Sequence, residues 1–242
     1  SQLDVDRMDY LSRDAYFTGI NYGYIDHEKL IRSMVVDGQR ICFKESGLSS
    51  IENFILGRYH MYKQVYYHPS SLAYEMIVVG LLRRYIDLYK EGFAFKDHYK
   101  ILEPLARKTK LNNDEYLCLD DHLIYACAKQ FENEDDAVLK DLSQRLIYHR
   151  PLKSIFVNSE EEKEAILLKL KEANYDPRYY YFTNKASQVV YKSAKNDDLS
   201  YIGIYTKKGI VEELSKVSFV VKALVEGNIN TNSSNIVISP IL

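Results

Sequence analysis

The chain has 242 residues, of which 46% are hydrophobic and 27% are charged, and its net charge is −2. This near-neutral charge argues against nucleic acid or an anionic membrane as a partner, and the longest apolar run, residues 76–82, is too short to span a bilayer. The three cysteines, Cys42, Cys118 and Cys127, lie far apart in the sequence. That spacing argues against a disulfide framework and predicts a protein of the reducing cytoplasm.

Helical patterns dominate the first part of the chain. Residues 4–18 are predicted to form a helix because the acidic first turn suits the helix dipole and Gly19 follows the last turn. Further helices are expected at residues 26–34, 48–68, 70–92, 113–130 and 135–150, and a strand at residues 39–43. Ser49 or Ser50 is the expected N-cap of the third helix, and Asn112 or Asn113 that of the fifth.

The pattern changes after Pro151. Strands are expected at residues 153–158, 178–184 and 200–206, with an amphipathic helix at residues 159–173, and the tail 227–242 combines a polar loop with an edge strand. The predicted fold is therefore mainly α-helical over residues 1–150, followed by a small α+β domain over residues 151–242.

Asp6, Tyr10 and Asp14 follow one another at intervals of four, so they lie along one face of the first predicted helix, with Arg7 nearby. A carboxylate there is a candidate metal ligand, an arginine is a candidate phosphate contact, and a second carboxylate can accept from a hydroxyl. The alternative is a solvated helix whose aspartates and arginines form ordinary surface pairs.

A second stripe has the same spacing: Arg58, Tyr62 and Tyr66, with His68 just before Pro69. An arginine followed by two phenols can extend from a phosphate to a sugar or base. The alternative is an amphipathic helix whose tyrosines face the core, while the arginine extends to solvent.

Both stripes together resemble the HD-domain dNTP triphosphohydrolases. LDVDRMDYLSRDAYFTGI (residues 3–20) is similar to the last motif of that family, and ENFILGRYHMYKQVYYHP (residues 52–69) is similar to its downstream nucleotide-pocket segment. The resemblance covers roughly residues 3–155. It implies that the first 150 residues are the C-terminal part of an HD-type helical core.

Carried over to the first stripe, the resemblance implies that Asp6 is the last ligand of the metal site. Arg7 would contact the triphosphate, and Tyr10 would lie against the phosphates or the sugar. Asp14 would accept a hydrogen bond from the deoxyribose 3′-hydroxyl.

In the second stripe, the resemblance implies that Arg58 holds a phosphate and that Tyr62 lies in the nucleotide pocket where relatives have a histidine. Tyr66 would pack on the sugar and help to exclude a 2′-hydroxyl, and His68 would lie near the base. Lys44, Arg150 and Lys153 match positions that contact activator phosphates in relatives.

The sequence departs from the family in one respect: it contains no His-Asp dipeptide. The family's other metal ligands and its catalytic histidine are therefore expected upstream of residue 1. Asp6 alone cannot hold a catalytic metal, which needs at least three protein ligands. This chain by itself is accordingly expected to be inactive.

The resemblance implies that the complete protein hydrolyses a dNTP to deoxynucleoside and triphosphate with a divalent ion, either Mg, Mn, Zn, Fe or Ni. It also implies activation by GTP or a dNTP and a homotetrameric assembly. Two alternatives stay open: a non-catalytic oligomerisation or nucleotide-sensing module, and an HD phosphohydrolase that acts on another nucleotide phosphate ester.

Overall fold

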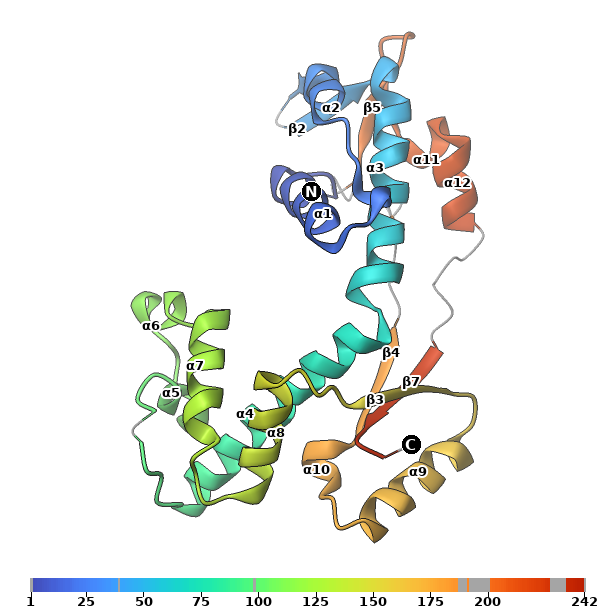
Figure 1. The fold of residues 1–242 in the computed structure, drawn as a ribbon. Helices are drawn as coiled ribbons and strands as arrows, with labels where there is room; N and C mark the ends of the chain where they lie inside the picture. Colours follow the sequence, from blue (N-terminus) through green and yellow to red (C-terminus); the bar gives the residue numbers. More distant parts are fainter. Residues whose placement is uncertain are drawn as a thin grey trace. The chain divides into compact units, whose positions relative to one another are not determined.

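The computed structural model of the chain describes residues 2–38, 40–97, 99–186, 191, 201–226 and 234–241. Its internal contacts form two compact units: unit 1 combines residues 1–68 with 186–233, and unit 2 combines residues 69–185 with 234–242. Each unit is built mainly of helices and contains one small sheet (Figure 1). The predicted fold class, a helical core with a small α+β part, is confirmed.

The two units do not follow the boundary expected at residue 150, and that boundary stays a prediction. Strands late in the chain complete sheets in both units, because β5 pairs with β2 and β7 pairs with β3. The change from helical to strand-like sequence patterns after Pro151 indicates a change in local secondary structure. The compact units, in contrast, depend on pairing between segments that are distant in the sequence.

Helix α1, Val5–Thr18, begins and ends as the sequence predicts. The Asp4 side chain caps it by accepting from the Arg7 N–H at 3.0 Å, and Gly19 ends it in the left-handed conformation (φ 71°). The remaining helices of unit 1 are η1 (Asn21–Gly23), α2 (His27–Ser33), η2 (Glu45–Gly47), α3 (Leu48–Met61), a π-helical turn (Tyr62–Tyr66), α11 (Leu214–Val217) and α12 (Phe219–Glu226). Helix α3 begins one residue before Ser49 with Gly47 at the N-cap position, so the serine cap expected there is wrong.

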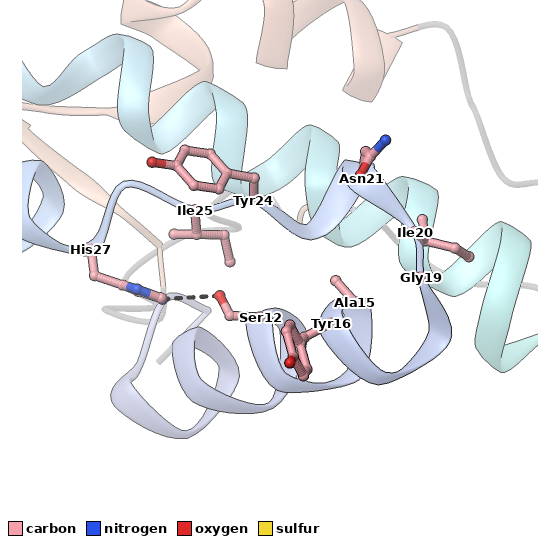
Figure 2. A pocket seen from close by; sticks show the side chains of 9 residues that line it. All are labelled: Ser12, Ala15, Tyr16, Gly19, Ile20, Asn21, Tyr24, Ile25 and His27. Atoms are coloured by element: carbon pink, nitrogen blue, oxygen red, sulfur yellow. Dashed lines mark hydrogen bonds between the residues drawn. The ribbon is translucent and has the colours of Figure 1, made fainter.

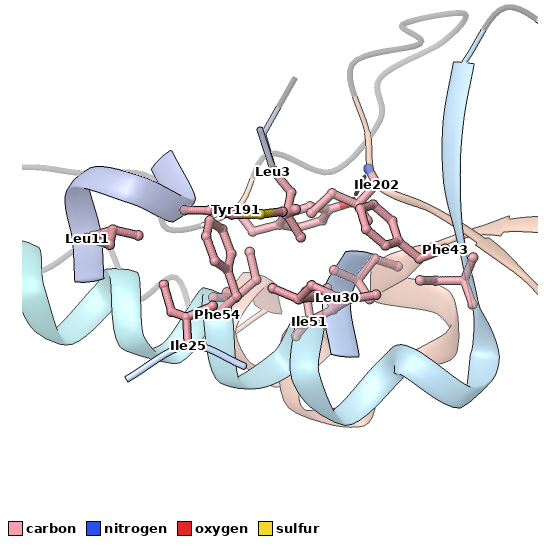
Figure 3. Close-up of a cluster of buried hydrophobic side chains, with 14 of the residues drawn as sticks. Leu3, Leu11, Ile25, Leu30, Phe43, Ile51, Phe54, Tyr191 and Ile202 are labelled. Atoms are coloured by element: carbon pink, nitrogen blue, oxygen red, sulfur yellow. Dashed lines mark hydrogen bonds between the residues drawn. The ribbon is translucent and has the colours of Figure 1, made fainter. Parts of the chain in front are cut away.

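The sheet of unit 1 has the order β1-β2-β5-β6, with strands Met34–Asp37, Arg40–Lys44, Gly203–Tyr205 and Val211–Glu213. Strand β2 corresponds to the strand predicted at residues 39–43, and β5 lies within the strand predicted at residues 200–206. Gln39 and Ser200, the first residues of these two predicted strands, lie outside the described residues. Apolar side chains from the helices and the sheet form the core of this unit, among them Leu11, Phe43, Phe54 and Ile202 (Figure 3).

Three contacts hold the segment around η1 against α3. A Cβ atom built on Gly57 would come within 2.7 Å of the Tyr22 carbonyl oxygen, so the backbones approach more closely than any other residue would allow. The Tyr22 ring stacks on His60 with centroids 4.6 Å apart, and Asn53 Nδ2 donates to the Tyr24 carbonyl oxygen at 3.0 Å. The chain between α1 and α2 therefore has a defined position in unit 1.

The helices of unit 2 are α4 (Pro69–Glu91), α5 (Glu103–Arg107), α6 (Asn113–Leu117), α7 (Asp121–Phe131), α8 (Ala137–Ile147), α9 (Glu160–Glu172) and α10 (Pro177–Tyr180). The helix expected over residues 113–130 is divided, because Asp120 accepts from Leu123 N–H and so starts a new helix in the middle of that range. Asn112, one of the two expected caps, starts α6.

The sheet of unit 2 has the order β3-β7-β4, with strands Lys153–Val157, Ser234–Ser239 and Phe182–Ala186. Two predictions are corrected here. The tail strand β7 lies in the centre of its sheet rather than at an edge, and its residues 236–239 are buried between the neighbouring strands. Residues 177–180 of the tyrosine-rich segment form a helical turn instead of a strand, because Asp176 caps them and Pro177 suits a first helical position. The polar loop expected at 227–233 lies outside the described residues.

Across the described parts of both units, we find no helix that is both long enough and apolar enough to cross a membrane.

Gly57→Ala is predicted to destabilise the protein by about 1–3 kcal/mol, because the added methyl group has to displace the backbone at Tyr22. Ser49→Ala, at an exposed position of the same helix, is the control and is expected to change stability by no more than about 0.5 kcal/mol. Thermal unfolding of the two variants measures the difference, and equal stability would contradict the close approach described above.

Candidate functional site

Helix α1 presents Asp6 and Arg7 in its first turn. Asp6 is exposed, whereas Arg7 is partly buried and forms an ion pair with the capping residue Asp4. Asp4 therefore binds both the backbone and the guanidinium group of Arg7, which holds the arginine beside the start of the helix.

Tyr10 and Asp14, one and two turns further along α1, meet the two tyrosines of the second stripe. The Tyr10 and Tyr62 hydroxyl oxygens are 3.4 Å apart, and Tyr66 Oη donates to Asp14 Oδ2 at 2.6 Å. These four residues, here called the phenol cluster, bring together two stripes that lie 52 residues apart in the sequence.

The rings of the phenol cluster pack edge to face. The centroids of Tyr62 and Tyr66 are 4.8 Å apart with an interplanar angle of 69°, and those of Tyr10 and Tyr66 are 6.2 Å apart with an angle of 71°. Tyr10 and Tyr66 also pack against the apolar core of unit 1. The rings of Tyr10 and Tyr66 thus support the core, while their hydroxyl groups are bonded within the cluster. The binding role of the second stripe stays a prediction.

Tyr10 and Tyr66 are both held in the protonated form. Burial, followed by the hydrogen bond with Tyr62, raises the pKa of Tyr10 to about 12. Burial and the hydrogen bond to Asp14 raise the pKa of Tyr66 still further above its usual value. At neutral pH these groups are hydrogen-bond donors.

Arg58 lies one helical turn before Tyr62, and its guanidinium carbon is 5.6 Å from the centre of the Tyr62 ring. Its Nε atom is buried and has no hydrogen-bond partner within the described part of the chain. The positive charges of Arg58 and Arg7 both act to lower the pKa of Tyr10, so both lie within electrostatic reach of that phenol. The cluster is therefore cationic beside Tyr10 and Tyr62 and anionic at Asp14.

A metal site is not formed by the described residues alone. No group of three or more histidine, cysteine, aspartate or glutamate side chains gathers among them. Asp6 is thus a single exposed carboxylate, and the set of donors described here does not fit a divalent ion by itself.

The other predicted residues belong to both units, and all of them are exposed. His68 is exposed and follows the π-helical turn. Lys44 is exposed at the end of β2 in unit 1. In unit 2, Arg150 lies 5.8 Å from the centre of the Tyr148 ring, and Lys153 is exposed at the start of β3. Their assignment to an activator site stays a prediction.

Sequence reasoning missed two features of the site. The pairing of Arg7 with Asp4 was not foreseen, although an N-cap carboxylate three residues before an arginine is a recognisable pattern. The direct bonds between the stripes were not foreseen either. Their signal was the shared four-residue spacing of Tyr10 with Asp14 and of Tyr62 with Tyr66, which allows two bonds at once.

The chain is similar to several known proteins. The family described as HD associated region matches residues 25–100. The protein YwfO of Bacillus subtilis is 36% identical over 234 residues, which cover 93% of this chain and 53% of YwfO. The deoxynucleoside triphosphate triphosphohydrolase SAMHD1 homolog of Dictyostelium discoideum is 28% identical over 152 residues, covering 61% of this chain and 26% of that protein.

A crystal structure of a phosphohydrolase from Bacteroides thetaiotaomicron superposes with a TM-score of 0.79 at 26% identity, covering 100% of this chain and 62% of that one. The chain spans about half the length of the curated relatives that match it over most of its length. Together these findings show that the chain is similar to an HD associated region and, at lower identity, to a phosphohydrolase of known structure.

The bond between Tyr66 and Asp14 is predicted to couple the two residues by about 1–2 kcal/mol, because it joins a phenol to a carboxylate in a partly buried place. A double-mutant cycle of Tyr66→Phe and Asp14→Asn, followed by chemical denaturation, measures this coupling. A matched cycle of Tyr59→Phe with Asp14→Asn is the control and is expected to give less than about 0.5 kcal/mol. Equal values in the two cycles would contradict the bond.

Proposed function

We propose that this chain forms the nucleotide-binding wall of a dNTP triphosphohydrolase, which converts a dNTP and water to deoxynucleoside and triphosphate. The single observation that carries the proposal is the buried Nε of Arg58, a donor without a partner in the described structure, close to the phenols of Tyr62 and Tyr10. A buried unpaired donor costs about 1–3 kcal/mol, and an acceptor-rich ligand such as a triphosphate removes that cost.

The polarity of the cluster suits a nucleotide bound along it. Arg58 and Arg7 would offset the negative charge of the phosphates, and Tyr10 and Tyr62 would donate to phosphate or sugar oxygens. Tyr66 bonds one oxygen of Asp14, and the carboxylate has a second oxygen with which to accept from the sugar 3′-hydroxyl. The Tyr66 ring would then lie against the sugar and exclude a 2′-hydroxyl.

The reacting groups would come from the rest of the protein. In the proposed enzyme Asp6 contributes one ligand to a divalent ion whose other ligands lie outside this chain, since the described residues do not complete such a site. That ion would supply Lewis-acid chemistry, while the residues described here bind and orient the nucleotide. This proposal agrees with the coverage of YwfO, of which this chain matches only about half.

Regulation by a nucleotide activator in a homotetramer is part of the proposal. Lys44, Arg150 and Lys153 would supply positive charge for activator phosphates, and all three are exposed. The alternatives, a nucleotide-sensing module without catalysis and a phosphohydrolase with another nucleotide substrate, predict different products in the same assay.

The uninterrupted protein that contains this chain is predicted to release inorganic triphosphate from dNTPs in the presence of Mn²⁺, with GTP or dGTP supplied as activator. Ion-exchange chromatography of the products distinguishes triphosphate from pyrophosphate or monophosphate. Arg58→Ala is expected to lower kcat/KM about 10- to 100-fold, the loss of one charge-assisted contact. Arg13→Ala, an exposed arginine of α1 paired with Asp9, is the control and should leave kcat/KM unchanged. Absence of triphosphate under all conditions would overturn the proposal in favour of the sensing module, and release of another phosphate product would favour the second alternative.

Tyr66→Ala is predicted to lower the preference for dNTPs over ribonucleotides at least about tenfold, because removing the ring opens space around C2′. The measurement is the ratio of kcat/KM for dGTP and GTP in the uninterrupted protein. Tyr59→Ala, which removes a partly buried tyrosine about two turns earlier, is the control for general loosening of α3. An unchanged ratio in Tyr66→Ala would assign sugar discrimination to another residue.

A further inference from the structure

An open pocket in unit 1 is lined from α1 by Ser12, Ala15 and Tyr16, which lie on a different face of the helix from Tyr10 and Asp14. Its volume is about 440 Å³, which is within the range of small-molecule sites, and it lies between α1 and the segment from Gly19 to His27, as Figure 2 shows. We call it the α1–η1 pocket. From the residues that line it, we propose that it binds an uncharged nucleoside.

The lining of the pocket carries no formally charged side chain of the aspartate, glutamate, lysine or arginine type. The described lining therefore offers no lysine or arginine to pair with a phosphate, whereas the phenol cluster has two arginines nearby. Ala15 and Ile25 form an apolar interior, and Ile25 is buried. This combination selects a neutral ligand with an apolar face.

Two tyrosine rings line the pocket and are not buried in the core of unit 1. Tyr16 is 81% exposed and Tyr24 is 80% exposed, although both line the cavity. Tyr16 extends from α1 and Tyr24 from the opposite segment (Figure 2). Exposed phenol rings provide flat apolar surfaces for stacking, which is how proteins commonly hold bases.

Polar groups at the pocket match the edge of a heteroaromatic ring. Asn21 offers both a donor and an acceptor. His27 Nε2 lies 3.0 Å from the Met8 carbonyl oxygen, and because a carbonyl oxygen only accepts, Nε2 carries the proton. Ser12 Oγ lies 3.2 Å from the same nitrogen, and this hydroxyl can donate to a ligand or accept from one.

The pocket is formed before any ligand arrives. The close approach of Gly57 to Tyr22, the Tyr22–His60 stack and the hydrogen bond from Asn53 to Tyr24 fix the segment that forms its second wall. A site that needs no rearrangement loses less entropy on binding. The assignment does not depend on the proposed hydrolase activity.

The test is isothermal titration calorimetry of the uninterrupted protein with deoxyadenosine, without added phosphates. We expect saturable binding that is at least tenfold weaker in Tyr24→Ala and in Asn21→Asp. Tyr116→Ala, which removes a 68% exposed tyrosine on α6 in unit 2, is the matched control and should bind like the wild type. If Tyr24→Ala does not fold, Tyr16→Ala is measured in its place, because Tyr16 lines the same pocket from α1.

Tyr66→Ala separates this pocket from the phenol cluster, because the Tyr66 ring is the one proposed to lie against a sugar there. It should bind deoxyadenosine with unchanged affinity, whatever the outcome of the dNTP hydrolysis assay. The proposal is overturned if the wild type shows no saturable binding, if Tyr24→Ala and Tyr16→Ala bind like the wild type, or if Tyr66→Ala abolishes binding. The last result would mean that the nucleoside occupies the phenol cluster.

Discussion

The pairing of two residues of α1 with two residues at the end of α3 is the contact on which the candidate site depends. Tyr10 meets Tyr62 and Asp14 meets Tyr66, and in both segments the partners are four residues apart. The π-helical turn wraps one extra residue, since the Tyr67 N–H bonds the Tyr62 carbonyl oxygen at 2.8 Å, five residues back. Two simultaneous bonds fix both the position of α1 along α3 and its rotation, so the polar groups of the two stripes have one arrangement.

Helical periodicity was sufficient to predict which side chains share a face, but not what those faces meet. The spacing of Tyr10 and Asp14 indicates a common stripe on any regular helix. Which partner occupies that stripe depends on how α1 packs on α3, and the apolar pattern of the two helices allows several alignments. The alternatives of a core tyrosine and a binding tyrosine were not exclusive, because a phenol can bury its ring and still present its hydroxyl.

Sequence reasoning missed one contact within α1, and it was wrong where long-range pairing decided the structure. Asp4 pairs with the Arg7 guanidinium because the cap places the carboxylate next to it, a contact that the spacing of the two residues in the sequence already indicates. The tail strand β7 lies between β3 and β4 because its buried residues 236–239 need neighbours on both sides. The α1–η1 pocket had no sequence signal, since it results from a left-handed turn at Gly19 and from close packing at Gly57.

Electrostatics restrict what the phenol cluster can bind and over what pH range. The folded-state pKa values of Tyr10 and Tyr66 lie above the ordinary value of 10, so the stability linked to these phenols is fully present below pH 10. It is lost only as pH rises through the folded-state value, which for Tyr10 is about 12. At neutral pH the cluster therefore keeps its donors, with cations beside Tyr10 and a carboxylate at Asp14. A ligand that pairs with all of these groups has hydrogen-bond acceptors at one end, for the arginines and phenols, and a hydroxyl group at the other end, for Asp14. A phosphorylated sugar has this arrangement of groups.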